Sequence, residues 1–300
     1  MPRAALTFWI GCVLLLGGCE TTVDPSIGSD QAFSLYGVLQ PEADTQWVRV
    51  YPIEDALTPT PPTPLDATLT STALETGQSQ TWRDSVVQES SGDYAHVYWF
   101  PFQVEHGRTY RLAATGPHGT AQVDVDVPAP ADLVVQPPQI NYTGVILPVL
   151  VNNTVPHLLG VEVEYFFQYD FAASAGSEPP LLRVTESYDG TQRRTDAGWI
   201  IPITLTVDFL TLRQRLDNAD LWNPRHGLVM VNMTLRLTVA NEEWDPPNGT
   251  FDADVLVQPG TMSNVENGFG FVGSGYRLDN TWTPEIETLV AAGWTDPSTL

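Results

Sequence analysis

The chain contains no lysine, so all thirteen of its basic residues are arginine. This absence excludes catalysis through a lysine Schiff base, a phosphate-binding loop that uses lysine, and the serine–lysine pair of penicillin-binding enzymes. Two explanations of the absence stay open. An acidic surface suits a high-salt habitat, and a GC-rich genome replaces lysine codons by arginine codons.

Cysteine is also scarce, because the chain has two, Cys12 and Cys19. We expect Cys12 to be removed with a signal peptide and Cys19 to be lipidated. The exported body then has no disulfide, and it has no thiolate for zinc binding or nucleophilic attack. No later run of apolar residues reaches the length of about 18 that a membrane-spanning helix needs.

Basic residues are few compared with acidic ones. The 36 acidic and 13 basic residues give a formal net charge of −23. A surface this negative repels the phosphate backbone of nucleic acids, so we expect no nucleic-acid partner. It also argues against docking to anionic lipids through a basic patch.

The N-terminus has the pattern of a lipoprotein signal. Arg3 precedes an apolar run over 4–16, and a Leu-Gly-Gly-Cys sequence ending at Cys19 closes it. This pattern is typical of a secretory signal, and its end resembles the lipobox of bacterial lipoproteins. We predict a signal peptide over 1–18, acyl chains on Cys19 and a flexible tether over 19–30. The alternative is an ordinary secreted signal whose cysteine has no role.

Short stretches that alternate apolar and polar residues dominate the first half. They cover 32–39, 47–52, 108–114 and 122–127. Period-two alternation between Gly- and Pro-rich turns is typical of half-buried β-strands. Prolines at 128–130 and 137–138 mark a boundary between two domains, which we predict at 31–128 and 139–300.

The second half continues the β pattern and adds two helices. Strands are predicted over 158–171, 181–187, 199–207, 227–240 and 251–257. One helix is predicted over 208–218, and a C-terminal helix has Thr283 as N-cap, Pro284 as first residue and Gly293 as its end. The sequence therefore predicts an all-β fold of two β-sandwich, immunoglobulin-like domains with one inserted short helix and a C-terminal helix.

Three segments resemble one protein family. They are Phe33 to Pro52, Val104 to Tyr110 and Ser263 to Gly275. Together they are similar to segments of the Bacteroidota lipoproteins known as domain of unknown function 4249, while residues 140–200 show no matching pattern. The resemblance implies a lipoprotein of the outer membrane, often encoded near energy-dependent outer-membrane receptors. It implies no catalytic residues.

The segment 268–273 matches the pattern G-x-G-x-x-G. A dinucleotide site needs a helix that opens on these glycines and an acid about twenty residues later. Residues 274–277 are poor helix formers, and the first downstream acid, Asp279, is too close. A glycine-rich β-turn or bulge packed against backbone is therefore the better interpretation.

Four oxygen-bearing residues lie close together around a Pro-Pro turn, namely Asp245, Asn248, Asp252 and Asp254. Carboxylate and amide oxygens suit Ca²⁺. Their spacing fits no calcium-binding loop, so a solvated acidic turn is the stronger alternative.

Other catalytic devices are weak or missing. Asp124 and Asp126 share one strand face, either as paired carboxylates or as its polar outer surface. The five histidines have no zinc-binding spacing, and no serine lies in G-x-S-x-G. We expect no enzyme activity and no cofactor.

Aromatic residues are concentrated in two runs, 94–102 and 165–171. Alternation along a strand places half of each run in the core, and the outward half can stack on a glycan or a partner. Tyr98, Trp99 and Phe100 are the candidate binding residues.

These observations together predict a non-catalytic, lipid-anchored binding or accessory protein of the outer membrane. Its expected partners are the membrane, through the lipid, and an outer-membrane receptor or a glycan. One alternative is a carboxylate- or calcium-assisted hydrolase of glycans or peptides. Another is a structural or adhesive component of the cell surface.

Overall fold

The computed structural model describes residues 31–53, 62–90, 92, 94–152, 155–169, 181–219, 227–244 and 263–299. Strands predominate in these residues, which also form two α-helices. The predicted all-β, sandwich-like fold is therefore confirmed. The predicted strand over 251–257 lies outside the described residues.

The strands of the first half are β1 (Phe33–Leu39), β2 (Gln46–Pro52), β3 (Thr68–Ala73), β4 (Ser79–Thr81), β5 (Arg83–Gln88), β6 (Tyr94–Phe100), β7 (Thr109–Gly116) and β8 (Gly119–Asp126). Those that follow are β9 (Leu133–Val135), β10 (Gln139–Asn141), β11 (Gly144–Asn152), β12 (His157–Tyr169), β13 (Leu181–Ser187), β14 (Arg193–Thr195), β15 (Gly198–Ile203), β16 (Leu228–Ala240) and β17 (Gly268–Trp282). The helices of the described residues are α2 (Leu205–Asn218), α4 (Ile286–Ala292) and a 3-10 turn over Pro297–Thr299.

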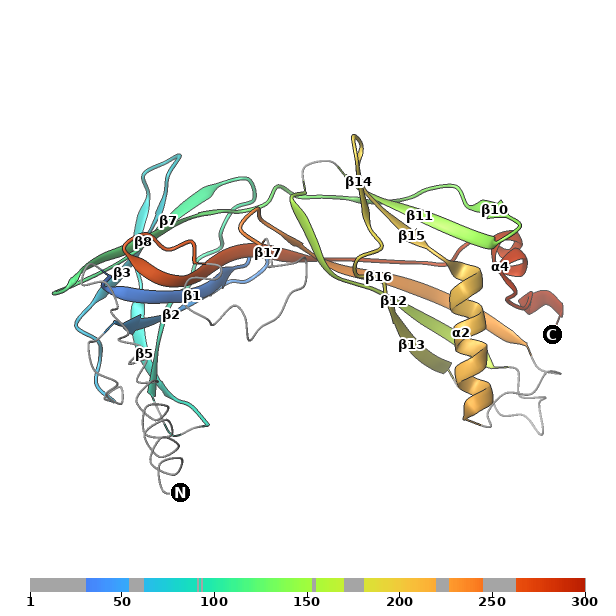
Figure 1. Cartoon of the computed structure of the whole chain (residues 1–300), viewed down its shortest axis with the longest axis horizontal. Coiled ribbons are helices and arrows are strands. Elements are labelled where there is room, and N and C mark those ends of the chain that lie inside the picture. The colour runs from blue at the N-terminus through green and yellow to red at the C-terminus, as the bar shows by residue number, and fades with distance from the viewer. Residues whose placement is uncertain are drawn as a thin grey trace, which may run out of the picture. The chain divides into compact units, whose positions relative to one another are not determined.

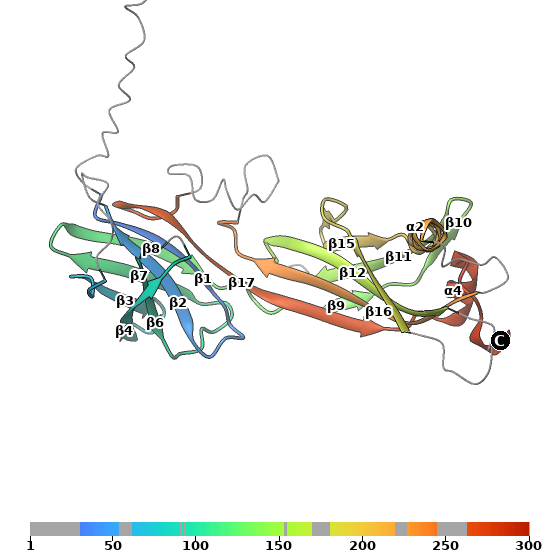
Figure 2. The ribbon, with the colours of Figure 1, turned by 90° about the horizontal axis from the view of Figure 1, so that it is seen from below.

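One long strand, β17, belongs to both halves of the largest sheet. The order of this eight-stranded sheet is β13-β12-β16-β17-β1-β2-β6-β5. The first half of β17 runs parallel to β1, and its second half is antiparallel to β16. Figures 1 and 2 show β17 passing from β1 to β16.

A first hydrophobic core lies between part of this sheet and the four-stranded sheet β4-β3-β7-β8. Its residues follow the predicted alternation. Val48 and Val50 of β2 are buried, and so are Val123 and Val125 of β8. The β7–β8 hairpin closes with Gly116 paired to Gly119, at the turn that the sequence predicts.

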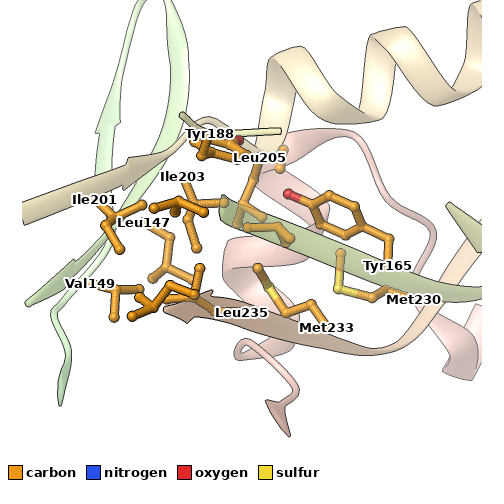
Figure 3. Packing of buried hydrophobic residues seen from close by; sticks show 14 of the residues in the cluster. Leu147, Val149, Tyr165, Tyr188, Ile201, Ile203, Leu205, Met230, Met233 and Leu235 are labelled. Atoms are coloured by element: carbon orange, nitrogen blue, oxygen red, sulfur yellow. The ribbon is translucent and has the colours of Figure 1, made fainter. Parts of the chain in front are cut away.

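A second core lies between strands β12 and β16 of the large sheet and the sheet that contains β10, β11, β15 and β14. Figure 3 shows Leu147 and Val149 packed with Ile201, Ile203 and Leu235. Helices α2 and α4 add their apolar faces to the same core.

Apart from Val265 and Val272, the residues of the first core lie within 32–127 and those of the second lie within 131–294. Val265 and Val272 pack in the first core, although both follow the residues that form most of the second. Val272 reaches it because β17 pairs with β1, and Val265 lies next to Glu266, which forms a bridge to Gln122 of β8. Residues 31–300 form one compact unit.

Helix α2 begins earlier than the sequence predicts. Its first residue is Leu205, so the preceding strand β15 ends at Ile203 and does not reach residue 207. The β-branched run before residue 208 favours a strand. Burial of Leu205 in the second core and the bond from the Asp208 N–H to the Thr204 carbonyl favour the helical turn instead.

The start of helix α4 also differs from the prediction. Glu285 is the N-cap residue and Ile286 begins the helix. Thr283 does not cap it, because its hydroxyl donates to the Val231 carbonyl of β16 at 2.8 Å. Gly293 ends the helix in the left-handed conformation, with φ of 109°, as predicted.

The G-x-G-x-x-G segment forms a strand, β17, and opens no helix. A Cβ on Gly268 would lie 2.3 Å from the Phe33 carbonyl oxygen, and one on Gly270 would lie 2.0 Å from the Leu35 carbonyl oxygen. The glycines therefore allow β17 to approach the backbone of β1 closely, in line with the predicted packing against backbone.

Candidate functional site

Three side chains on neighbouring strands form a surface row, which we call the tryptophan ladder; Trp47 and Arg83 are exposed and Trp99 is half-buried. Trp47 of β2 pairs with Trp99 of β6, and Trp99 pairs with Arg83 of β5. The two indole rings stack with centroids 5.8 Å apart. The Arg83 guanidinium carbon lies 5.2 Å from the centroid of the Trp99 ring, within cation–π range. Trp47 is 53% exposed, so the ladder presents a large ring to solvent.

The alternation of β2 explains why Trp47 faces outward. Val48 and Val50 point into the first core, so Trp47 and Arg49 lie on the opposite face. The Trp99 indole N–H donates to the Ser85 hydroxyl oxygen at 2.9 Å, which holds the ring against β5. The Trp99 ring is therefore held between Trp47 and Arg83 on the outer face of the sheet.

Of the three predicted binding residues, Trp99 alone belongs to this surface. Tyr98 is 1% exposed and packs in the first core, with its hydroxyl donating to the Ala67 carbonyl at 3.1 Å. Burial also raises the pKa of the Tyr98 hydroxyl well above its usual range. Phe100 is half-buried and packs against the same core beside Phe102. Tyr98 is therefore a core residue rather than a binding residue.

Sequence reasoning missed Trp47 and Arg83. The available signal was the period-two pattern of 47–52, which puts Trp47 on the same face of its strand as Arg49. What the pattern lacked was the strand pairing, which brings residues 47, 83 and 99 into one row.

The two acidic residues of β8 lie on its exposed face, as expected of a polar outer surface. Asp124 accepts two hydrogen bonds from the Arg111 guanidinium, each 2.6 Å long. Asp126 accepts a hydrogen bond from the Thr109 hydroxyl. Each carboxylate is held by a cross-strand partner, so the pair has the geometry of a polar surface.

The predicted calcium ligands Asp245, Asn248, Asp252 and Asp254 lie outside the described residues, as does Cys19. Within the described ranges, no group of three or more histidine, cysteine or acidic side chains is placed to hold a metal ion.

A buried histidine–aspartate pair connects β5 and β6. His96 is fully buried, and its Nδ1 lies 3.0 Å from Asp84 Oδ2. The same carboxylate oxygen accepts the Leu65 N–H at 2.9 Å. The other ring nitrogen, Nε2, has no hydrogen-bond partner among the described residues. The Asp84 carboxylate thus connects the His96 ring to the backbone of the Leu65 segment.

A second buried polar cluster lies at the start of α2. The Asp208 carboxylate accepts hydrogen bonds from the hydroxyls of Tyr165 and Tyr188. The Tyr188 oxygen in turn accepts the Thr204 N–H at 2.8 Å. Figure 3 shows Tyr165 and Tyr188 in the second core beneath α2. The cluster satisfies the polar groups of these buried side chains and fixes the first turn of the helix to β12.

This cluster predicts a pH-dependent stability. Burial raises the pKa of Asp208 above its ordinary value, and the negative charge of Glu186 raises it further. The hydrogen bonds from Tyr165 and Tyr188 lower it, but burial has the larger effect. Because the pKa of Asp208 is higher in the native state than in the unfolded state, this group contributes stability at low pH. The contribution is lost as the pH rises from about 4, the unfolded pKa, through the native pKa. We therefore expect Asp208→Asn to gain stability relative to wild type over that range.

The measurement is the urea midpoint of both proteins from pH 3 upward. Asp217→Asn is the control, because Asp217 is an exposed aspartate on the same helix. We expect the change with pH to be larger for Asp208→Asn than for this control, because Asp208 is buried and Asp217 is exposed. A change for Asp208→Asn no larger than that of the control would contradict the assignment.

A network of ion pairs covers the outer face of the second half of the large sheet. Glu164 is 1% exposed and contacts Arg183 at 2.8 Å and Arg236 at 2.7 Å. A hollow of about 230 Å³ nearby is lined in part by Arg236 and Arg277. Arg277 contacts Asp279 at 3.0 Å. Because acidic side chains already neutralise these arginines, the hollow is a poor anion site.

Comparison with known proteins gives no relative for this chain. No protein-family model matches it, and no curated protein sequence matches it.

In the part of the chain that the structure describes, no helix is long and apolar enough to cross a membrane.

Proposed function

We propose that this protein is a non-catalytic, lipid-anchored binding protein of the outer membrane that serves an outer-membrane receptor through the tryptophan ladder. The observation behind this proposal is the Trp47–Trp99–Arg83 row on the outer face of the sheet, with Trp47 53% exposed. Tryptophan and arginine are the residues most enriched in the energetic centres of protein interfaces. A contiguous apolar patch on a protein surface often marks a site of interaction with a partner.

Charge supports a protein partner rather than a nucleic acid. The chain has a net charge of −23, which repels phosphate backbones. Arg83 adds a positive group at the edge of the ladder, and its cation–π contact leaves the guanidinium N–H groups available for an acidic or carbonyl partner.

The predicted lipid anchor supports a partner in the same membrane. Acyl chains on Cys19 would confine the protein to two dimensions, which raises its effective concentration towards a membrane protein. An interface of a few side chains then stays occupied even at low intrinsic affinity. The resemblance to lipoproteins encoded near outer-membrane receptors points to the same class of partner.

The test is in-cell crosslinking followed by purification of the lipidated protein from outer membranes. We expect one outer-membrane protein to be recovered with wild type. The Trp47→Ala, Trp99→Ala double variant should recover it at least tenfold less, because each interface tryptophan contributes about 2 kcal/mol or more. Tyr142→Ala is the matched control, since Tyr142 is an exposed aromatic in the turn between β10 and β11, outside the ladder.

Two results would overturn this proposal. One is equal recovery of the receptor by the double variant and by Tyr142→Ala. The other is turnover of a glycan or peptide library by the purified protein with no receptor recovered, which would favour a hydrolase. A melting temperature within a few degrees of wild type confirms that the double variant is folded.

A further inference from the structure

A polar hollow of about 220 Å³ lies beside the edge strand β4, away from the tryptophan ladder. The β3–β4 hairpin forms one side of it, and the segment joining β6 to β7 forms the other. Pockets for drug-sized ligands have volumes of about 300–1,000 Å³. The hollow therefore has room for a ligand of about one ring.

Three glutamine side chains line the hollow. Those of Gln78 and Gln80 make no hydrogen bond to any described residue. Gln103 uses its amide N–H to bond the Pro41 carbonyl at 3.0 Å, and its carbonyl oxygen stays available. A primary amide offers two donors and an acceptor. The wall therefore offers both kinds of group within one small volume, as a ligand with several hydroxyls requires.

The charges in the hollow cancel. Glu105 and Arg108 form an ion pair at 2.7 Å, and both line it. The rest of the protein is strongly negative, with a chain total of −23. An anionic ligand is therefore repelled at long range, and a cation finds no uncompensated carboxylate in the hollow. The electrostatics favour a neutral ligand.

One wall of the hollow is aromatic. Phe102 is half-buried and held by edge contacts with Trp82 and Tyr110, with centroids 5.9 Å apart in each case. The polar groups behind it are already bonded, since Ser71 accepts the Trp82 indole N–H at 2.9 Å and Tyr110 accepts the Glu105 N–H at 3.0 Å. Phe102 is thus a positioned apolar surface, against which the C–H face of a ring can pack.

We propose that this hollow binds one neutral sugar residue, either as a free sugar or as the end of a glycan chain. A pyranose has hydroxyl groups around its rim and an apolar C–H face, which match the glutamine amides and Phe102. This site is separate from the tryptophan ladder, because no ladder residue lines it.

The test is binding of the full lipidated chain, in a detergent without a sugar headgroup, to an array of neutral and acidic glycans. We expect neutral glycans to bind, with the Kd measured by calorimetry. The Gln78→Ala, Gln80→Ala double variant and Phe102→Leu should each raise that Kd at least tenfold. Gln214→Ala is the matched control, because Gln214 is an exposed glutamine on α2.

Competition by a neutral methyl glycoside identifies the source of the ligand. Displacement by the monosaccharide shows that a free sugar is sufficient, and failure to displace shows that a glycan chain is needed. The proposal is overturned if no neutral glycan binds, if only acidic glycans bind, or if the double variant binds as tightly as Gln214→Ala. Receptor crosslinking through the tryptophan ladder is a separate measurement, so either proposal can fail alone.

Discussion

Replacing Gly270 by alanine should lower the free energy of unfolding by about 2–5 kcal/mol, since a left-handed L-residue costs about 1–2 kcal/mol and overpacking adds about 1–3 kcal/mol. Gly270 has φ of 106°, and a Cβ there would lie 2.0 Å from the Leu35 carbonyl oxygen. That oxygen belongs to the backbone of β1, so no side-chain rotation relieves the contact. The measurement is the urea midpoint of the purified chain.

The variant Gly77→Ala separates the cost of the left-handed backbone from the cost of the steric clash. Gly77 also has a positive φ, 69°, but no atom lies within 4 Å of the position that a Cβ would occupy. It therefore incurs the backbone cost of about 1–2 kcal/mol without a steric clash. If both variants lost the same stability, the close approach of β17 to β1 would not be the reason for glycine at 270.

The second large effect is expected at the lipidation site. Cys19→Ser should abolish incorporation of labelled palmitate and leave full-length precursor, because the hydroxyl cannot form the thioether to which the first acyl chains are attached. Cys12→Ser is the matched control, since Cys12 lies inside the apolar run. We expect it to be labelled like wild type. Undiminished labelling of Cys19→Ser would rule out Cys19 as the anchor.

Loss of the anchor also predicts a consequence for binding. A protein released from the membrane loses the effective concentration that confinement gives it. Receptor recovery through the tryptophan ladder should then fall even though the ladder residues are unchanged.

Secondary structure followed from local sequence wherever one face of a strand is buried. The alternation in 47–52 and 122–127 corresponds to β2 and β8, because period two places every second side chain in the core. Prediction was less accurate where tertiary contacts outweigh local preference. Leu205 is helical rather than extended because the second core buries it, and Thr283 bonds β16 rather than capping α4.

The candidate site was predictable in part. The outward direction of Trp47 and the aromatic run at 94–102 are both visible in the sequence. The row that Trp47 forms with Trp99 and Arg83 depends on which strands pair and in what register. The sequence of one strand shows only which face of that strand a residue occupies. The sugar site is harder still to predict, because its walls come from a hairpin and a connecting segment with no common motif.

The sequence by itself determined the composition-dependent properties of this protein: a strongly acidic chain without lysine, a predicted lipid anchor at Cys19, and an all-β pattern. These properties depend on residue type and on spacing between near neighbours. Only the tertiary structure decided that β17 serves both cores, that Tyr98 is buried, and that Trp47, Trp99 and Arg83 form one surface. Those outcomes depend on pairing between residues far apart in the chain, which local periodicity does not encode.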